Sequence, residues 1–350
     1  MSLYPLMDVF IAFVLEVIIG YPKWIPHPVK FINWLAKVVE VGYRKITDLL
    51  YNKKVKALGD DYVHSGVNRS RTEKYSGMCF TIIMALLITI IMLVLVGVAY
   101  LINPVVYHVI NVYFIYSAFA IKTVAFESVE VCDALKDRDI FKAGNILSKN
   151  IGREIEHFDE QDIIRGAVEH TADRAAESVI SPVFYAVIGS LFGLGAPMVY
   201  LYKTINALKL TKGHKNGKIE NFGYAAVKIN DLANFLPARI TGILFVIASI
   251  FLKKDFKSSF AIMRRDKRKH HNPNLGYPEA AVAGALGIKL GGSGLYFGDI
   301  IDKPIIGDNK RSAEIRDISD TITLMYIAAI IGMILFGIVY SLIFAVWYFN

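Results

Sequence analysis

Three carboxylates recur every four residues in one stretch of the sequence: Glu169, Asp173 and Glu177. On a helix this spacing places the three side chains on one face, where like charges repel each other. One interpretation is a solvated face whose charge is offset by the basic residues Arg165 and Arg174. The other is a site for a hard divalent cation such as magnesium (Mg2+), which binds carboxylate oxygens and bridges them to substrate phosphates. The spacing alone leaves both interpretations open.

A dense run of basic residues, 264–269, leads directly into a loop that contains Pro273 and Pro278. Prolines fix backbone geometry, and Asn274 with Gly276 can adopt special conformations, so the segment is typical of a rigid ligand-binding loop. Basic side chains at the start of this loop could bind phosphate. The alternative is an interfacial anchor followed by an ordinary turn.

Other patterns carry less information about chemistry. The adjacent His270 and His271 are each a weak indication of catalysis, because a lone histidine is more often structural. Six glycines between residues 284 and 298 do not match the Gly-rich phosphate-binding spacings, and close helix packing in a membrane is their ordinary explanation. The cysteines Cys79 and Cys132 lie in unlike contexts, which indicates neither a disulfide framework nor thiol chemistry.

The composition and the apolar runs of the chain indicate a membrane protein. The chain has 350 residues, of which 54% are hydrophobic and 20% charged, too apolar for an ordinary soluble domain. Long apolar runs that approach the length of a membrane span cover residues 3–20, 78–101, 104–126 and 321–349, and two further apolar segments cover residues 179–208 and 235–252. We therefore predict an all-α, polytopic integral membrane protein with about five or six hydrophobic segments and helical cytoplasmic loops. Residues 1–350 form a single membrane domain, within which residues 127–178 are a polar helical cytoplasmic insertion.

The distribution of basic residues predicts the orientation of the chain. Residues 21–77 contain eleven basic and five acidic residues, so this loop is expected on the cytoplasmic side of the plasma membrane, with the other motif-bearing loops. A single crossing by residues 179–208 would place the next basic segment outside, so we expect a broken or re-entrant hairpin there. The net charge of +8 is explained by such loops beside anionic lipid, and no nucleic-acid partner is expected.

Ordered motifs over most of the chain resemble the cobalamin-biosynthesis family of adenosylcobinamide-phosphate synthases. They begin with Pro-His-Pro-Val at 26–29, continue through 152–154, 167–169, 179–182 and 231–239, and are densest over 265–304. The resemblance implies an ATP-dependent amide ligase that joins a phosphorylated amino alcohol to a side-chain carboxylate of adenosylcobyric acid, a corrinoid. It also implies ATP and Mg2+ as cofactors and membrane lipid as a partner; the oligomeric state stays open.

The resemblance and the chemistry of amide formation together suggest site residues. Candidates for acid, base or metal chemistry are Glu169, Asp231, His270 and Glu279, and candidates for metal ligation are Glu169, Asp173 and Glu177. Candidates for holding phosphate and substrate are Arg153, Lys215, Asn216, Asn234, Arg239, Arg265, Lys269 and Asn274. We expect them on one cytoplasmic rim around a cavity at membrane level, formed partly by residues 179–208.

Several positions depart from the pattern of the family. Tyr21, Lys209 and Asn230 stand where that pattern has acidic residues, and Arg174 stands where it has an asparagine. These changes suggest an alternative: a divergent, noncatalytic or redirected paralogue that binds a corrinoid or another amine or phosphate ligand. A transporter is a third hypothesis, but the chain has few spans and no duplicated half.

Overall fold

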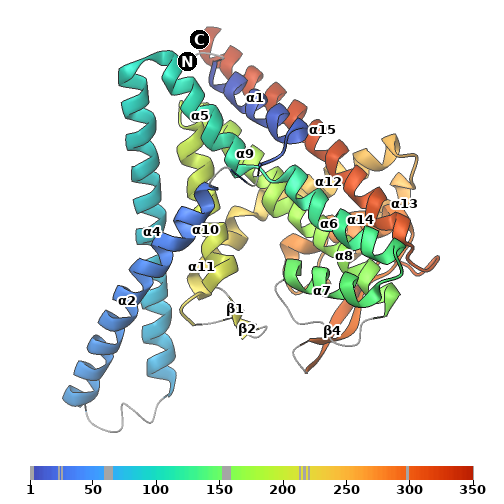
Figure 1. Ribbon diagram of the computed structural model, residues 1–350, viewed down its shortest axis with the longest axis horizontal. Helices are drawn as coiled ribbons and strands as arrows, with labels where there is room; N and C mark the ends of the chain where they lie inside the picture. Colours follow the sequence, from blue (N-terminus) through green and yellow to red (C-terminus); the bar gives the residue numbers. More distant parts are fainter. Residues whose placement is uncertain are drawn as a thin grey trace.

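The computed structural model is built almost entirely from helices (Figure 1). It describes residues 4–22, 24, 27–58, 66–151, 159–212, 214–215, 218–219, 221–296 and 299–349. The strands in these ranges form two short antiparallel hairpins, one of β1 (His214–Lys215) with β2 (Lys218–Ile219) and one of β3 (Leu290–Tyr296) with β4 (Asp299–Ile306). The predicted all-α membrane fold is confirmed.

Within the described residues, three helical segments have the length and apolar composition of a membrane span. They lie in α4 (Gly66–Ile102), in α5 (Pro104–Ala118) with α6 (Ile121–Lys136), and in α15 (Ile315–Phe349). A further candidate is the pair α11 (Tyr224–Ala233) and α12 (Phe235–Phe251), bent by 50°. The remaining apolar segments are shorter helices: α1 (Tyr4–Ile18) has 15 residues, fewer than the roughly 20 that cross the hydrocarbon core directly.

The turn between α4 and α5 follows from its two residues, Asn103 and Pro104. The Asn103 side chain accepts a hydrogen bond from the N–H of Val105 at 2.7 Å, which caps α5. Pro104 occupies the first helical turn, where its missing N–H costs no helical hydrogen bond. The apolar runs 78–101 and 104–126 therefore form a helical hairpin.

The segment 179–208 is a broken helical hairpin, as predicted. α8 (Glu160–Arg174) continues through a π-helical turn, η1 (Ala175–Ile180), into α9 (Ser181–Ser190), and α10 (Gly195–Lys212) packs back along α9. Gly193 closes the connection with a φ of 71°, which glycine adopts without a Cβ penalty. The Tyr107 hydroxyl donates to the Gly193 carbonyl at 3.1 Å and so ties the turn to α5.

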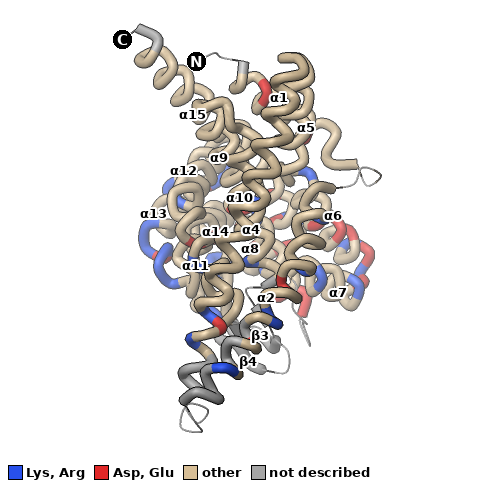
Figure 2. Tube along the Cα trace, turned by 90° about the vertical axis from the view of Figure 1, so that its left-hand side faces the viewer, with Lys and Arg blue, Asp and Glu red and all other residues tan. Residues whose placement is uncertain are grey.

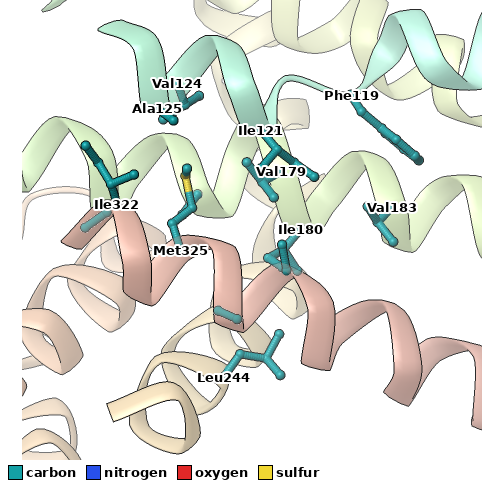
Figure 3. Close-up of a cluster of buried hydrophobic side chains, with 14 of the residues drawn as sticks. Phe119, Ile121, Val124, Ala125, Val179, Ile180, Val183, Leu244, Ile322 and Met325 are labelled. Atoms are coloured by element: carbon teal, nitrogen blue, oxygen red, sulfur yellow. The ribbon is translucent and has the colours of Figure 1, made fainter. Parts of the chain in front are cut away.

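One cluster of the apolar core lies where η1 and α9 pack against the start of α6, against α12 and against α15. Figure 3 shows Phe119, Ile121 and Val124 facing Val179, Val183 and their neighbours, while Ile322 and Met325 of α15 and Leu244 of α12 close the cluster from the other side. All of these side chains are less than 10% exposed. Close packing of these side chains contributes to holding α6, η1, α9, α12 and α15 together.

Charge is segregated along the molecule (Figure 2). The half that carries the two termini is almost uncharged, and Lys, Arg, Asp and Glu gather around α6, α7 (Ile140–Ile151) and α13 (Phe256–Asp266), and along α2 (Pro28–Leu58). The polar stretch 127–178, predicted to be helical, is divided between α6 and α7 near its start. Arg138 has a φ of 60° there, and the Asp139 side chain accepts from the N–H of Lys142 at 2.9 Å, which begins the new helix.

The glycines after residue 284 do not all serve helix packing. Gly284 lies in α14 (Pro273–Leu286), and a Cβ there would meet the Ser258 carbonyl oxygen at 2.6 Å, so α13 and α14 need it. Gly287 ends α14 in the left-handed region with a φ of 69°. Gly291 and Gly292 also have positive φ and lie in β3, so the prediction of helix packing is wrong for them.

Candidate functional site

The carboxylates of the predicted face lie on α8 and η1 and are buried. Glu169 is 7% exposed and Glu177 is 6% exposed. Arg165 pairs with Asp162, one turn earlier, and with neither of these two carboxylates. The interpretation as a solvated face offset by nearby arginines is therefore wrong, and the compensating charges come from distant parts of the chain.

Glu169 is held by the β3–β4 hairpin. The Lys303 Nζ lies 2.7 Å from Glu169 Oε2, and the N–H of Gly291 donates to Oε1 at 2.7 Å. Burial raises the pKa of Glu169, but the Lys303 cation and these two hydrogen bonds outweigh burial and leave this pKa below its usual value. Glu169 is therefore an ionised group with both oxygens occupied.

Asp173 and Glu279 form a pair of buried carboxyl groups beside Glu169. The charge of Glu279 acts on Asp173, whose Oδ1 is buried and has no hydrogen-bond partner among the described residues. Burial and then the charge of Glu279 raise the pKa of Asp173 well above its usual value, and burial and then the charge of Glu169 raise the pKa of Glu279 to about 8. The pair can therefore store a proton near neutral pH.

His270 reaches this pair from the loop between α13 and α14. Its Nε2 lies 3.7 Å from Glu279 Oε1. Its Nδ1 is 3.0 Å from the backbone N of Asn272 and 2.9 Å from the backbone oxygen of the same residue. Because Asn272 offers Nδ1 both a donor and an acceptor, the ring keeps a partner in either neutral tautomer and when protonated. Asn272 therefore holds the imidazole ring in place beside Glu279.

The loop after His270 is anchored to α11 through Asp231. The Asn272 side chain donates to Asp231 Oδ1 at 2.9 Å, and the Asn274 side chain donates to the Asp231 carbonyl oxygen at 2.6 Å. Asn272 also caps α14, with Pro273 in the first helical turn. Asn274 and Gly276 are helical, so the special loop conformations predicted for them are wrong. Gly276 instead allows the Lys267 carbonyl oxygen to approach, which a Cβ would meet at 2.4 Å.

Arg239 extends the site on α12. Its guanidinium lies 3.4 Å from the centroid of the Phe235 ring and 4.7 Å from that of Tyr277. It also donates to Asn274 Oδ1 at 3.4 Å. The two rings and the hydrogen bonds that Nη1 donates to the Phe235 carbonyl oxygen and to Asn274 hold the guanidinium in place.

Arg265 and Lys269, both predicted to bind phosphate, instead form ion pairs with Asp266 at the end of α13. Arg265 donates from Nε and Nη2 at 2.7 and 2.8 Å, and the Lys269 Nζ lies 2.8 Å from Asp266 Oδ1. The N–H of Gly307 donates to the same carboxylate, and these contacts hold the pKa of the buried Asp266 well below its usual value. Arg265 and Lys269 therefore fasten the base of the His270 loop.

Glu177 lies one turn beyond Asp173 and has separate partners. Lys209 of α10 forms an ion pair with its Oε1, and the Asn230 side chain donates to the same oxygen at 3.5 Å. Asn234 is 1% exposed and accepts from Ser181 at 2.6 Å, so it joins α9 to the start of α12. Two departures from the family's pattern, Lys209 and Asn230, thus act together on one carboxylate.

The other candidates concern substrate and metal binding. Lys215 lies in β1, while Arg153 and Asn216 lie outside the described residues. Across the part of the chain that the structure describes, no three His, Cys, Asp or Glu side chains are arranged to hold a metal ion together. Magnesium ligation by Glu169, Asp173 and Glu177 stays a prediction.

Three residues of the site were not proposed from the sequence as functional: Lys303, Asn272 and Tyr277. Lys303 and Tyr277 lie within the dense stretch of motifs. Their positions in the sequence do not predict that Lys303 contacts Glu169 or that Tyr277 contacts Arg239. Asn272 precedes a proline, which is the available sequence signal for a helix cap. Its contact with Asp231 becomes visible only when α11 is placed beside the loop.

Comparison with known proteins identifies the family. The family model described as "CobD/Cbib protein" matches residues 9–325. The cobalamin biosynthesis protein CobD of Clostridium perfringens is 35% identical over 329 residues, which cover 94% of this chain and 96% of that protein. The proteins of the same name from Clostridium acetobutylicum and Leptospira interrogans are each 35% identical, over 95% of this chain and 98% and 96% of theirs. No solved structure matches. The matched segment contains the whole site described above, and the chain belongs to the CobD/Cbib family.

Proposed function

We propose that this protein is an ATP-dependent amide ligase of cobalamin biosynthesis, which joins a phosphorylated amino alcohol to a side-chain carboxylate of adenosylcobyric acid. The observation that carries the proposal is the family match over residues 9–325, which spans every element of the site. The site supports it with groups suited to amide formation: a proton-storing carboxyl pair, a histidine beside it, and cationic side chains around them.

The reaction has two steps with different demands. In the first, the corrinoid carboxylate attacks the γ-phosphorus of ATP, so that an acyl phosphate forms and ADP leaves. In the second, the amine attacks the acyl carbon, phosphate leaves, and the new amide nitrogen loses a proton. Negative charge develops in the first step, and a base is needed in the second.

The side chains of the chain can be assigned to these demands. His270 accepts the amine proton and passes it toward Glu279, from which its Nε2 is 3.7 Å away. Arg239, held flat between Phe235 and Tyr277, binds the phosphoryl oxygens. Lys303 keeps Glu169 neutralised, so the site does not repel an anionic substrate.

Magnesium enters this proposal as the counter-ion of the ATP phosphates. Both oxygens of Glu169 are taken by Lys303 and Gly291, and Glu177 is paired with Lys209. A cage made only of protein carboxylates does not fit these contacts, whereas Mg2+ commonly binds through substrate phosphates and water.

We also place the charged half of the molecule in the cytoplasm, at the plasma membrane. The basic residues of α13 and described basic residues of α2 lie in that half, and basic loops are retained on the cytoplasmic side. The nucleotide and the phosphorylated amine would then reach the site from the cytoplasm.

The test is mass spectrometry of the detergent-solubilised protein incubated with adenosylcobyric acid, ATP, Mg2+ and a panel of phosphorylated amino alcohols. We expect the amide product together with ADP and phosphate. His270→Ala should reduce turnover by about 10²-fold or more, while His271→Ala, at the exposed neighbouring histidine, serves as the matched control. Equal loss in both variants would assign His270 a structural role.

A noncatalytic or redirected paralogue is the second candidate, and one observation favours it. At position 209 the family's pattern has an acidic residue, whereas this chain has Lys209, which forms an ion pair with Glu177. The site therefore carries less negative charge. Corrinoid binding without product, for every amine in the panel, would establish this alternative. Absence of both binding and product would reject both candidates.

A further inference from the structure

The exposed face of α13, with the turns at its two ends, carries cations that have no acidic partners. These cations are the exposed side chains of Lys253, Lys257, Arg264 and Arg268. Lys257 and Arg264 are seven residues apart, which is two helical turns, so they project from the same side of α13. Within the described residues, no carboxylate oxygen lies within 4.0 Å of the charged nitrogens of these four side chains.

The acidic residues of this segment are engaged by other cations. One oxygen of Asp255 lies 3.8 Å from the Lys310 Nζ. Asp266 is fully buried and pairs with Arg265 and Lys269. Two acids that reach the segment from other elements are also paired, Asp320 with Lys254 and Asp308 with Arg265. The four exposed cations therefore form a surface of one sign.

Aromatic side chains lie among these cations. Phe256 and Phe260 are both exposed, Phe260 to 51%. Phe260 is three residues from Lys257 and four from Arg264, so these three side chains are neighbours on the surface of the helix. The exposed face of α13 thus combines two aromatic rings with a basic edge.

The exposed apolar surface of α13 continues that of α12. Ile250 and Phe251, at the end of α12, are exposed as well, and α12 belongs to the bent pair with the composition of a membrane span. Figure 2 shows α13 beside and below α12, with its Lys and Arg residues at the outer edge of the molecule, where the charged half begins. α13 therefore lies close to the level at which the chain leaves the apolar part of the bilayer.

This combination of features matches the surface of a membrane. On amphipathic helices at the interface, aromatic rings enter the headgroup region while Lys and Arg attract anionic lipids. The attraction grows with the number of cations near the surface and decays within a Debye length. An acidic protein would also neutralise the cations, but it would not account for the continuity of the apolar surface with α12.

We propose that the exposed face of α13 binds anionic phospholipids at the membrane surface. The lipid phosphates contact the four exposed cations, and the rings of Phe256 and Phe260 enter between the headgroups. Because α13 leads into the loop that carries His270, this contact holds the start of that loop at the membrane. The inference does not depend on the reaction that the site catalyses.

The experiment places a label on this face of the full-length protein. In a background with Cys79→Ala and Cys132→Ala, Phe260→Cys is coupled to an environment-sensitive fluorophore, and the protein is placed in phosphatidylcholine nanodiscs with increasing phosphatidylglycerol. We expect the emission to move to shorter wavelengths as phosphatidylglycerol is added, and high salt to reverse part of this shift. The same label at Phe141→Cys on α7, where the side chain is 81% exposed, should not respond.

Removal of cations separates the recognition of charge from apolar insertion. Addition of Lys257→Gln and Arg264→Gln should abolish most of the shift that phosphatidylglycerol causes. The matched control, Lys142→Gln with Lys149→Gln on α7, removes the same charge from exposed positions and should keep the full shift.

A second measurement needs no label. Phosphatidylglycerol should raise the unfolding temperature of the unaltered protein, and it should raise that of Lys257→Gln with Arg264→Gln by less. In pure phosphatidylcholine both double variants should unfold at the temperature of the unaltered protein, because they change exposed side chains.

Two outcomes would overturn the proposal. One is an equal shift in the double variant of α13 and its control on α7, and the other is a label at residue 260 that stays in water in every nanodisc. In the second case, a shift on addition of poly-glutamate would assign the face to an acidic protein. Because no ATP or corrinoid is present, failure of the ligase proposal would leave these results unaffected.

Discussion

At the scale of single residues, this protein keeps charge in its interior by neutralising it in sets drawn from distant parts of the chain. Glu169 is paired with Lys303, and Glu177 with Lys209. The buried Asp266 and Asp317 are also paired, in their case with the arginines Arg265 and Arg311 close by in the sequence. Breaking such a pair costs more than replacing both members, because the remaining charge keeps its desolvation penalty.

This asymmetry predicts the behaviour of Glu169 and Lys303. Lys303→Met should lower the stability by about 3 kcal/mol or more, because it leaves Glu169 buried with only the N–H of Gly291 as partner. The double variant Glu169→Gln with Lys303→Met should recover most of that loss. Thermal unfolding of the single and double variants in detergent measures the coupling. Strictly additive effects would show that the ion pair contributes nothing.

The pKa of Glu279 predicts a dependence of stability on pH. The pKa of Glu279 is about 8 in the folded protein and 4.5 for an ordinary glutamate, so folding favours the protonated carboxyl. The associated stability is fully present below about pH 4.5 and is lost as the pH rises through about 8. Glu279→Gln keeps a neutral side chain, so its unfolding temperature should fall less than that of the unaltered protein between about pH 5 and pH 9. Parallel curves would contradict the raised pKa.

At the scale of elements, the site depends on how closely helices and hairpins approach. α14 carries Glu279 and lies against α13 at Gly284, while the loop between these helices carries His270. The β3–β4 hairpin, whose first strand contains two glycines with positive φ, places Lys303 against α8. Small residues therefore set the distances on which the chemistry depends.

Gly284→Ala should separate α13 from α14. The new Cβ would lie 2.6 Å from the Ser258 carbonyl oxygen and 2.7 Å from the Ser259 Cα, and backbone atoms cannot yield as a flexible side chain does. We expect a loss of about 1–3 kcal/mol of stability and a larger fractional loss of turnover, because the His270 loop moves. Gly337→Ala in α15, where a Cβ meets nothing within 4 Å, is the control. Equal effects of the two substitutions would exclude this explanation.

At the scale of the whole molecule, the uncharged half with both termini contrasts with the charged half that holds the site (Figure 2). The turn at Asn103 lies in the first half, and the exposed Lys257 of α13 lies in the second. A bilayer around the uncharged half would leave the charged half in water.

This arrangement predicts opposite accessibility for two introduced thiols. In a background with Cys79→Ala and Cys132→Ala, Asn103→Cys should react with an impermeant maleimide in intact cells, and Lys257→Cys only after the cells are opened. The native cysteines are removed because Cys79 is exposed. Labelling of both positions from outside would contradict the proposed orientation.

Three features could be predicted from the sequence: the class of membrane protein, the broken helical hairpin within 179–208, and the resemblance to the family. These features depend on local composition, helix capping and motif order, all of which are readable along the chain. The structure brings Asn274 into contact with Asp231 and Arg239 and places His270 beside Glu279, while their functional roles stay predictions.

The tertiary structure alone decided which charges meet. Residues 134 positions apart form the Glu169–Lys303 pair, whereas Arg265 and Lys269, predicted for phosphate, bind Asp266. Arg165 and Arg174 were the expected counter-ions of the acidic face. Arg165 pairs with Asp162 instead, and the Nε of Arg174 has no hydrogen-bond partner among the described residues. A charge interacts through space over a few ångströms, and the sequence separation of two residues does not encode that distance.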